Sequence, residues 1–264
     1  MAAALGEVDD VRRFTDRSNY WRNLFDRETG FMRGKNLDGS WVSPFNPRFG
    51  TGKQPQYTEG NAWQYSWYVP HDVSGMIDSM GGKDKFAAKL DDLFSQSAPT
   101  EDEGATADVT GLIGLYAHGN EPSHHIAYLY NFCGQPWKTQ ALTRRIMRDF
   151  YADNVDGLCG NEDCGQMSAW YVLSALGFYP VNPADGNYWF GSPLVVSAEV
   201  ITESGNRFFV TTQNQAEQNV YVQSVTLNGT PLDRLYITHR EIMDGGELHF
   251  VMGPNPNIRW GRPN

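Results

Sequence analysis

The stretch GNEDCGQMSAWYVLSALGFYPVNP, residues 160–183, lies where the pattern of the chain changes from helical to strand-like. Two adjacent acids stand between glycines at its start, an apolar run predicts a helix over residues 166–176, and a turn rich in Pro and Asn closes it. Before this stretch the apolar residues recur with helical spacing, and after it short alternating runs of β-branched residues follow. The chain is therefore predicted to be mainly helical first and to end in strands.

The helical part contains several further elements. The apolar pattern predicts helices over residues 8–25, 61–80, 83–94, 124–133 and 136–150. Short polar connections join them, whereas residues 34–57 form one long loop rich in Gly, Pro and Asn, a type that is often functional. Pairs of helices joined in this way suit a toroid of helical hairpins, and an ordinary helical bundle fits the spacing equally well.

The last part of the chain predicts antiparallel strands. The runs are YWFGSPLVVSAEV, RFFVTTQ, NVYVQSVTLNGTPLD and ELHFVMG, separated by Gly and Asn turns. Asn228-Gly229 is a hairpin signal, because both residues tolerate the left-handed backbone of a tight turn. We place the boundary accordingly, with residues 1–185 as the helical part and residues 186–264 as the C-terminal β segment.

Composition excludes some classes of protein. The 264 residues carry a formal net charge of −10 spread along the chain, which argues against a nucleic-acid partner, since that needs a basic patch. Eight Trp and thirteen Tyr suit a carbohydrate cleft, where flat rings meet the apolar faces of sugars, although most such rings serve the core. No apolar run is long enough for a membrane span.

The N-terminus and the cysteines bear on the cellular compartment of the protein. The N-terminus MAAALGEVDDVRRF lacks the basic-then-apolar order of a signal peptide, so the chain is expected to be cytosolic or a piece of a longer protein. Three cysteines are too few for a disulfide framework. Cys159 and Cys164 flank the acidic loop, and they either pair or remain buried free thiols.

Glu59 lies in the first of three acid-bearing loops, YTEGNAWQYSW. A carboxyl group beside Trp63 and its aromatic neighbours is poorly solvated, which favours the protonated form. Such a group donates a proton near neutral pH, as the general acid of a glycosidase must. The structural alternative is that Thr58 and Glu59 cap the helix that begins near Asn61.

The second loop, HGNEPSHH, carries Asn120, Glu121, His124 and His125. The adjacent His124 and His125 cannot both face one site from a helix, and no HExxH spacing is present, so zinc is disfavoured. Oxygen ligands from Asn, Glu and Asp suit a hard cation such as calcium. The alternative for the two histidines is that one of them is a packed, hydrogen-bonded ring.

The third loop, GNEDCGQ, places Glu162 next to Asp163. Helix capping accounts for one of these acids. In a tight turn the two side chains point in different directions, so that one could activate water while the other binds a sugar or a metal. Three such loops in a helical frame with abundant Trp favour a glycosidase that uses two carboxylates.

Three blocks resemble signature sequences of glycoside hydrolase family 92, the calcium-dependent exo-α-mannosidases. They are YTEGNAWQYSWYVPHD, GLIGLYAHGNEPSHHIAYLY and GNEDCGQMSAWYVLSALGFYPVNP, and the resemblance extends in order over nearly the whole chain. It implies an N-terminal β-sandwich followed by an (α/α)6 barrel, with the last strands returning to the sandwich. On this basis the chain is the C-terminal portion: part of an (α/α)6 barrel followed by antiparallel strands that belong to a β-sandwich.

The resemblance also implies the chemistry, which is calcium-assisted inverting hydrolysis of terminal α-mannosides in N-glycans or mannans. Glu59 would be the general acid and Asp163 the general base, with Glu162 as the second candidate for the base. Calcium would lie near the mannose 2- and 3-hydroxyls, with Glu121 and Asp163 as its acidic neighbours and Asn161 as a weaker one. The expected substrate-binding residues are Asn120, Glu121, His124 and Trp63.

Two details refine this expectation. Members that cleave α-1,2 linkages are associated with a His-Glu-Pro sequence where this chain has Asn120-Glu121-Pro122, which puts α-1,2 preference in doubt. Glu at position 59 favours ordinary mannosides over mannose-1-phosphate diesters, whose leaving group needs no acid. The full-length protein is expected to be secreted or periplasmic and to supply the N-terminal β-sandwich, without which this chain is expected to be inactive. The alternative from another class is a non-catalytic carbohydrate-binding module.

Overall fold

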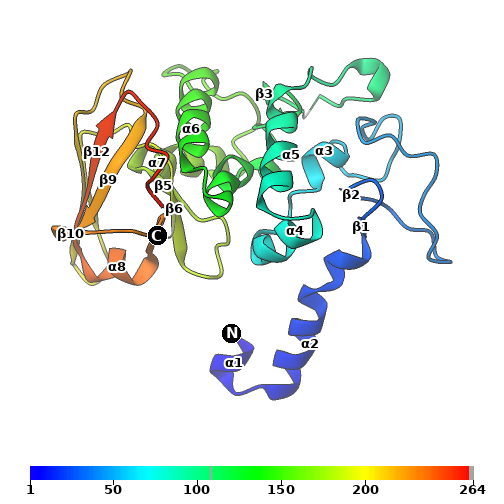
Figure 1. Cartoon of the computed structure of the whole chain (residues 1–264), viewed down its shortest axis with the longest axis horizontal. Coiled ribbons are helices and arrows are strands. Elements are labelled where there is room, and N and C mark those ends of the chain that lie inside the picture. Colours follow the sequence, from blue (N-terminus) through cyan, green and yellow to red (C-terminus); the bar gives the residue numbers. More distant parts are fainter. Residues whose placement is uncertain (108, 262–264) are drawn as a thin grey trace.

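The computed structural model describes residues 1–107 and 109–261, and it combines helices with strands (Figure 1). The N-terminal helices α1 (Ala2–Leu5) and α2 (Val8–Ser18) project from the body, which has helices at its centre and a sheet at one end (Figure 1). The predicted helix over residues 8–25 is too long, because the α-helix ends at Ser18. A 3-10 turn, η1 (Tyr20–Asn23), and a short hairpin of β1 (Phe25–Asp26) and β2 (Phe31–Met32) follow.

The prediction of one helix over residues 61–80 is wrong. The segment divides into α3 (Ala62–Tyr65), the 3-10 turn η2 (Pro70–Asp72) and α4 (Val73–Ser79). Pro70 has no N–H and disfavours helical backbone at the residue before it, so the first helix cannot continue through it. Asp72 then begins α4 as its N-cap, accepting a hydrogen bond from Gly75 N–H at 2.9 Å.

The central helices surround the larger core. The observed bounds of α6 (Pro136–Phe150) and α7 (Gln166–Leu176) are those predicted from the sequence. α5 (Lys83–Ser95) ends one residue later than predicted. The helix predicted over residues 124–133 is instead a buried 3-10 helix, η5 (Ile126–Cys133). The short elements between α5 and η5 are η3 (Glu101–Glu103), β3 (Leu112–Ile113), β4 (Tyr116–Ala117) and η4 (Glu121–Ser123).

The C-terminal part forms two sheets. The larger sheet has the order β10-β9-β12-β8-β7, and the smaller has the order β11-β6-β5. The strands of the larger sheet are β7 (Ser197–Ile201), β8 (Arg207–Gln213), β9 (Tyr221–Leu227), β10 (Thr230–Pro231) and β12 (Gly246–Gly253). Those of the smaller sheet are β5 (Phe178–Tyr179), β6 (Asn187–Phe190) and β11 (Tyr236–Thr238), which leads into α8 (His239–Asp244).

The strand pairing corrects one expectation and confirms another. β8 and β12 run parallel to each other, so the sheet is not purely antiparallel as predicted. The hairpin at Asn228-Gly229 is confirmed, since both residues have positive φ, 51° and 77°, between β9 and β10. The predicted boundary after residue 185 falls between β5 and β6, which pair with each other, so the two segments share the smaller sheet.

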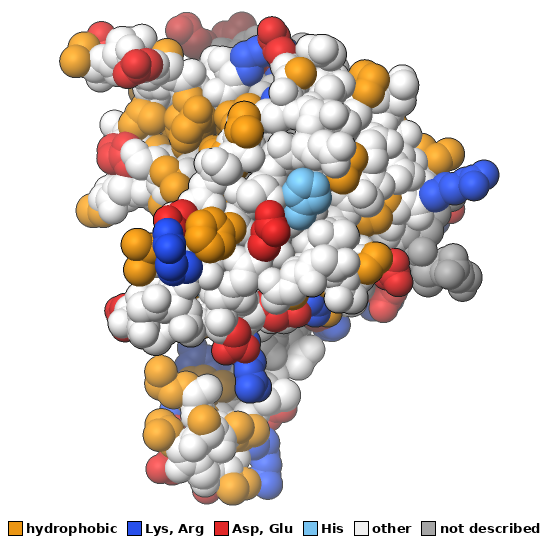
Figure 2. All heavy atoms as spheres, turned by 90° about the vertical axis from the view of Figure 1, so that its left-hand side faces the viewer, with side chains coloured by type: hydrophobic (Ala, Val, Ile, Leu, Met, Phe, Trp, Pro, Cys, Tyr) orange, Lys and Arg blue, Asp and Glu red, His pale blue; other side chains and the backbone are white. Residues whose placement is uncertain are grey.

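The outer face of the sheet end is exposed to solvent in this chain. Acidic and basic side chains are interspersed on it with hydrophobic ones (Figure 2). Arg207 and Glu199 form an ion pair there, across β8 and β7. The inner face carries Phe208, Val210 and Phe250, which are fully buried and form a second core between the sheet and the helices.

Candidate functional site

The structure brings the three acid-bearing loops together around one cavity of about 500 Å³. Its walls contain carboxyl groups and amides from distant parts of the chain, together with several small residues. The lining residues are Glu59, Ala107, Thr110, Gly119, Asn120, Glu121, Gly160, Asn161 and Asp163. A polar cavity of this kind, with three convergent carboxyl groups, is typical of a site for a polar ligand.

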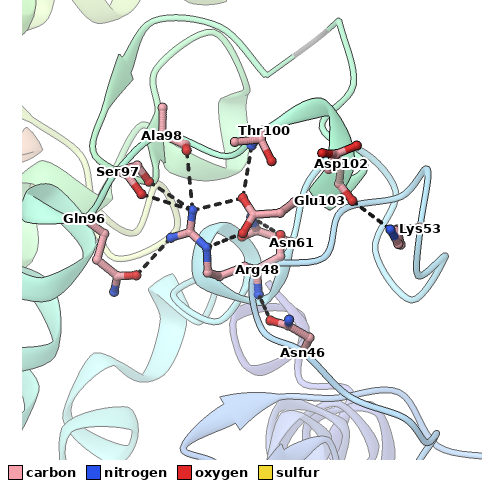
Figure 3. A network of polar contacts seen from close by, with 10 residues as sticks. All are labelled: Asn46, Arg48, Lys53, Asn61, Gln96, Ser97, Ala98, Thr100, Asp102 and Glu103. Carbon is pink, nitrogen blue, oxygen red and sulfur yellow. Dashed lines mark hydrogen bonds and ion pairs between the residues drawn. The ribbon is translucent and has the colours of Figure 1, made fainter.

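A polar network around Arg48 connects the start of α3 with the segment that follows α5 (Figure 3). The Arg48 guanidinium donates to both carboxylate oxygens of Glu103, at 2.6 and 3.0 Å, and also to Gln96 Oε1. This ion pair holds the pKa of the Glu103 carboxyl below its usual range. The Arg48 carbonyl accepts a hydrogen bond from Asn61 Nδ2 at 3.2 Å, so the network reaches the start of α3, next to Glu59.

Glu59 is not the helix cap. Asn61 is the N-cap of α3, with reciprocal hydrogen bonds between Asn61 and Gln64. The Glu59 backbone is fixed by Asn120 Nδ2, which donates to its carbonyl at 2.9 Å, and by the Tyr65 hydroxyl, which accepts from its N–H at 3.2 Å. Glu59 therefore does not cap the helix, and it lines the cavity shared with the other two loops.

The Glu121 loop is clamped to α7 through His124. This imidazole is buried, donates from Nε2 to the His118 carbonyl at 2.9 Å and accepts at Nδ1 from Gln166 Nε2 at 3.1 Å. Trp170 Nε1 donates to the His124 carbonyl at 3.0 Å. Burial lowers the pKa of His124 to about 4, so the ring is neutral at physiological pH. His124 therefore fixes the turn that carries Glu121.

His125 and His118 are also packed rings. His125 Nε2 donates to the Trp67 carbonyl at 2.8 Å, and His118 lies between the hydroxyls of Tyr116 and Tyr151, both at 2.7 Å. The alternative that one of His124 and His125 is a packed, hydrogen-bonded ring thus holds, and it holds for both. All three rings are buried, and both nitrogens of His118 and of His124, together with His125 Nε2, contact protein groups.

The third loop separates its two acids by backbone conformation. Asp163 and Cys164 have left-handed backbones, with φ of 51° and 57°, ahead of Gly165 at 91°. Glu162 turns back to α7, where it accepts hydrogen bonds from the Ser168 N–H at 3.2 Å and the Ser168 hydroxyl at 2.9 Å. Left-handed backbone at non-glycine residues is costly and often marks functional sites.

Asp163 faces Glu121 instead. The two carboxyl groups lie within hydrogen-bonding reach, and this hydrogen bond, followed by desolvation and the Glu121 charge, raises the pKa of Asp163. Glu162 therefore accepts hydrogen bonds at the start of α7, as a capping residue does, whereas Asp163 lines the cavity. Both members of the Glu121–Asp163 pair also line a second cavity of about 420 Å³, whose wall includes Tyr68, Gln166 and Tyr179.

Trp63 lies away from these cavities. Its ring packs edge-on against Phe31 at 4.9 Å between centroids, and neither cavity has Trp63 among its lining residues. The three cysteines are free; Cys159 is half-buried and Cys164 is exposed, so they neither pair nor form two buried thiols. The site includes residues that sequence reasoning missed, namely Thr110, Gln166 and Arg48. Of these three, only Gln166 could have been suspected from the sequence, because it directly follows the acidic loop and begins a predicted helix.

The cavity contains carboxyl and amide oxygens that could bind a hard cation. Within residues 1–107 and 109–261, no three His, Cys, Asp or Glu side chains are grouped as metal ligands. Glu121 and Asp163 nevertheless present two adjacent carboxyls, with Asn161 lining the same cavity. This donor set fits part of the shell of a hard cation, which takes six to eight oxygens, so the remaining ligands would come from elsewhere.

Residues from three acid-bearing loops thus line one polar cavity in a mixed α and β fold, an arrangement that suits the paired carboxyl groups of a glycoside hydrolase. Residues 1–254 match the glycosyl hydrolase family 92 catalytic domain, and the chain belongs to this family. A family GH92 alpha-mannosidase from Bacteroides thetaiotaomicron superimposes with a TM-score of 0.91 at 42% identity over 98% of this chain and 34% of that one. A family GH92 inverting mannosidase from the same species gives a TM-score of 0.86 at 38% identity over 98% of this chain and 36% of that one.

A curated relative from Arthroderma benhamiae is described as an uncharacterized secreted glycosidase. It is 29% identical over 275 residues, which cover 94% of this chain and 33% of the relative. The chain thus spans about a third of the length of the relatives that it matches. Among the described residues, no helix combines the length and the apolar character that a bilayer crossing requires.

Proposed function

We propose that the full-length protein is an inverting, calcium-assisted exo-α-mannosidase of N-glycans or mannans, and that this chain carries its acid and its base. The observation that carries the proposal is that Glu59 and Asp163 line one polar cavity although they come from distant loops. The similar structures are those of mannosidases, which supports the substrate class. The chain would form part of an (α/α)6 barrel, and its last strands would belong to a β-sandwich whose N-terminal portion the rest of a secreted or periplasmic protein would supply.

In this mechanism Glu59 protonates the glycosidic oxygen as the leaving group departs. Asp163 takes a proton from the water that attacks the opposite face of the sugar ring, which gives inversion. Glu162 is held by Ser168 and supports the helix end rather than the water.

Glu121, Asp163 and Asn161 are the residues of this chain that would hold calcium. The ion would supply positive charge near the mannose 2- and 3-hydroxyls and favour a flattened ring. Exhaustive chelation followed by dialysis is expected to abolish mannose release, and calcium rather than zinc is expected to restore it. Full activity in excess chelator would remove the metal from the proposal.

The test of the function is release of free mannose from an aryl α-mannoside by the full-length protein. Release that disappears in Asp163→Asn supports the enzyme. If the protein binds methyl α-mannoside but releases no mannose from any linkage-defined mannobiose, it is a non-catalytic carbohydrate-binding protein, and the proposed activity is wrong.

A further inference from the structure

Tyr65 connects the loop of the candidate acid with the loop of Glu121. The Tyr65 hydroxyl accepts a hydrogen bond from the Glu59 N–H at 3.2 Å. The side-chain amide of Asn120 lies within hydrogen-bonding reach of the same hydroxyl, and its Nδ2 donates to the Glu59 carbonyl at 2.9 Å. An amide NH₂ group carries two protons, so Asn120 can donate to both oxygens. Glu59, Tyr65 and Asn120 therefore contact one another pairwise.

The local fold brings the Tyr65 ring back over the turn that precedes α3. Tyr65 is the last residue of α3, whose start is fixed by the reciprocal hydrogen bonds of Asn61 and Gln64. A Cβ at Gly60 would lie 3.3 Å from Tyr65 Cε2 and 2.2 Å from Gln64 Oε1, so glycine lets the turn pass close to the ring. The Tyr57 ring packs against the Tyr65 ring, with 5.8 Å between their centroids. Packing against the turn and against Tyr57 therefore fixes where the hydroxyl lies.

The Tyr65 side chain is neutral at physiological pH. Burial, with smaller contributions from the charges of Glu59 and Glu121, raises the pKa of Tyr65 above its ordinary value. A phenol with such a pKa is a poor proton donor to a glycosidic oxygen near neutral pH. The place of Tyr65 beside Glu59 therefore suits orientation of the acid rather than transfer of a proton.

The position of the Glu59 backbone decides where its carboxyl group lies. A general acid has to reach the glycosidic oxygen within hydrogen-bonding distance, and a misplacement of about 1 Å can reduce catalysis about 10²-fold. Without the Tyr65 hydroxyl, the Glu59 N–H would lose this acceptor, and only the hydrogen bond from Asn120 to the carbonyl would join the two loops at this residue. The acid would then be held less closely.

We propose that Tyr65 is a positioning residue for the general acid: its hydroxyl fixes the Glu59 backbone against the Asn120 loop, so that the Glu59 carboxyl reaches the glycosidic oxygen. This inference rests on the proposed function, in which Glu59 protonates the leaving group. It adds a residue to that function, because Tyr65 acts through Glu59 and is not among the residues that line the active-site cavity.

The experiment measures kcat/KM of the full-length protein and of its Tyr65→Phe variant on α-mannobiose and on an aryl α-mannoside with an activated leaving group. Only the mannobiose needs a well-placed acid. We expect Tyr65→Phe to lose about tenfold or more on mannobiose and to stay within about threefold of the wild type on the aryl mannoside. The aryl activity also shows that the variant is folded. Equal losses on the two substrates, or no loss on mannobiose, would overturn the inference.

A double-mutant cycle shows whether Tyr65 acts through Glu59. In Glu59→Gln the acid is absent, so the addition of Tyr65→Phe is expected to cost less than about threefold on mannobiose. A further loss as large as the one that Tyr65→Phe causes in the wild type would contradict the inference.

Tyr57→Phe is the matched control, because it removes the hydrogen bond that the neighbouring hydroxyl donates to the Met32 carbonyl. A lower melting temperature and equal changes on the two substrates are expected. A preferential loss on mannobiose in this control would show that any disturbance of the turn has the same effect, which would refute a specific role of Tyr65. If the wild type hydrolyses neither substrate, the proposed activity fails and the acid role with it, whereas hydrolysis with equal losses in Tyr65→Phe refutes Tyr65 alone.

Discussion

The carboxyl group of Asp163 lies within hydrogen-bonding reach of the carboxyl group of Glu121, and this contact raises the pKa of Asp163. Two carboxyls this close repel each other when both are ionised, so they either share a proton or attract a cation. The fold maintains the contact from both sides: His124 ties the Glu121 turn to α7, and a left-handed turn aims Asp163 away from that helix. The pair is therefore the feature that most directly links this fold to the proposed hydrolysis.

Glu59→Gln is expected to reduce hydrolysis of α-mannobiose by about 10²–10⁴-fold, which is the contribution of a general acid. Aryl mannosides with activated leaving groups should lose much less, because their departure needs little protonation. Kinetics of both substrates give the comparison, with Glu101→Gln, an exposed acid in η3, as the control. Equal losses on the two substrates would remove Glu59 from the acid role.

Asp163→Asn and Glu162→Gln should separate catalysis from stability. Asp163→Asn is expected to abolish turnover of both kinds of mannoside, since each needs an activated water. Glu162→Gln should retain most of the activity and lose about 0.5–2 kcal/mol of stability, because it weakens acceptance of the hydrogen bonds from Ser168 at the start of α7. If Glu162→Gln is the inactive variant and Asp163→Asn is active, the base is Glu162.

Gln166→Met tests the clamp between the two acid-bearing loops. Gln166 Nε2 donates to His124 Nδ1 at 3.1 Å and to the Tyr179 hydroxyl at 3.2 Å, and Met has a similar shape without these donors. We expect kcat to fall about tenfold or more with a small change in melting temperature, because catalysis is sensitive to displacements of about 1 Å. Wild-type kcat in this variant would show that Gln166 does not position Glu121.

Lys89 gives a pH dependence of stability. It is largely buried beside Phe31, with Nζ 3.4 Å from the ring centroid, and burial lowers its pKa to about 8. In the unfolded chain its pKa is about 10.4, so the unfolded state binds more protons between about pH 8 and 10.4, and stability rises with pH across that window.

Lys89→Met is therefore expected to stabilise the protein by about 1–3 kcal/mol near pH 7, where the buried charge costs most, and to lose this advantage above about pH 10. The measurement is thermal denaturation of both proteins from pH 7 to 10. Lys85→Met, at an exposed position on the same helix, is the control and should change little. A lower melting temperature for Lys89→Met at pH 7 would show that the contact of Nζ with the Phe31 ring and its hydrogen bond to the Gly30 carbonyl together outweigh the cost of burial.

Local signals made part of this fold predictable from the sequence. α6 begins at Pro136, which suits the first position of a helix, and α7 ends before Gly177, whose φ of 96° is the usual helix terminator. The hairpin at Asn228-Gly229 follows from two residues that tolerate positive φ. In each case the decisive residues are neighbours in the sequence.

The rest depended on contacts between distant residues. The parallel pairing of β8 with β12 and the ion pair of Arg48 with Glu103 leave no local pattern. The candidate acids could be recognised as a set, but the division of labour between Glu162 and Asp163 follows from a left-handed turn and from the positions of Ser168 and Glu121, which the tertiary structure supplies.

The central claim is that Glu59 and Asp163 act on opposite faces of a mannose ring with a water at the base. Proton NMR of the full-length protein during the first minutes of α-mannoside hydrolysis tests it most directly, since it identifies the anomer released before mutarotation. The account predicts β-mannose as the first product, with carboxyl groups roughly 6.5–9.5 Å apart in the productive site. Early spectra that show α-mannose would contradict the account.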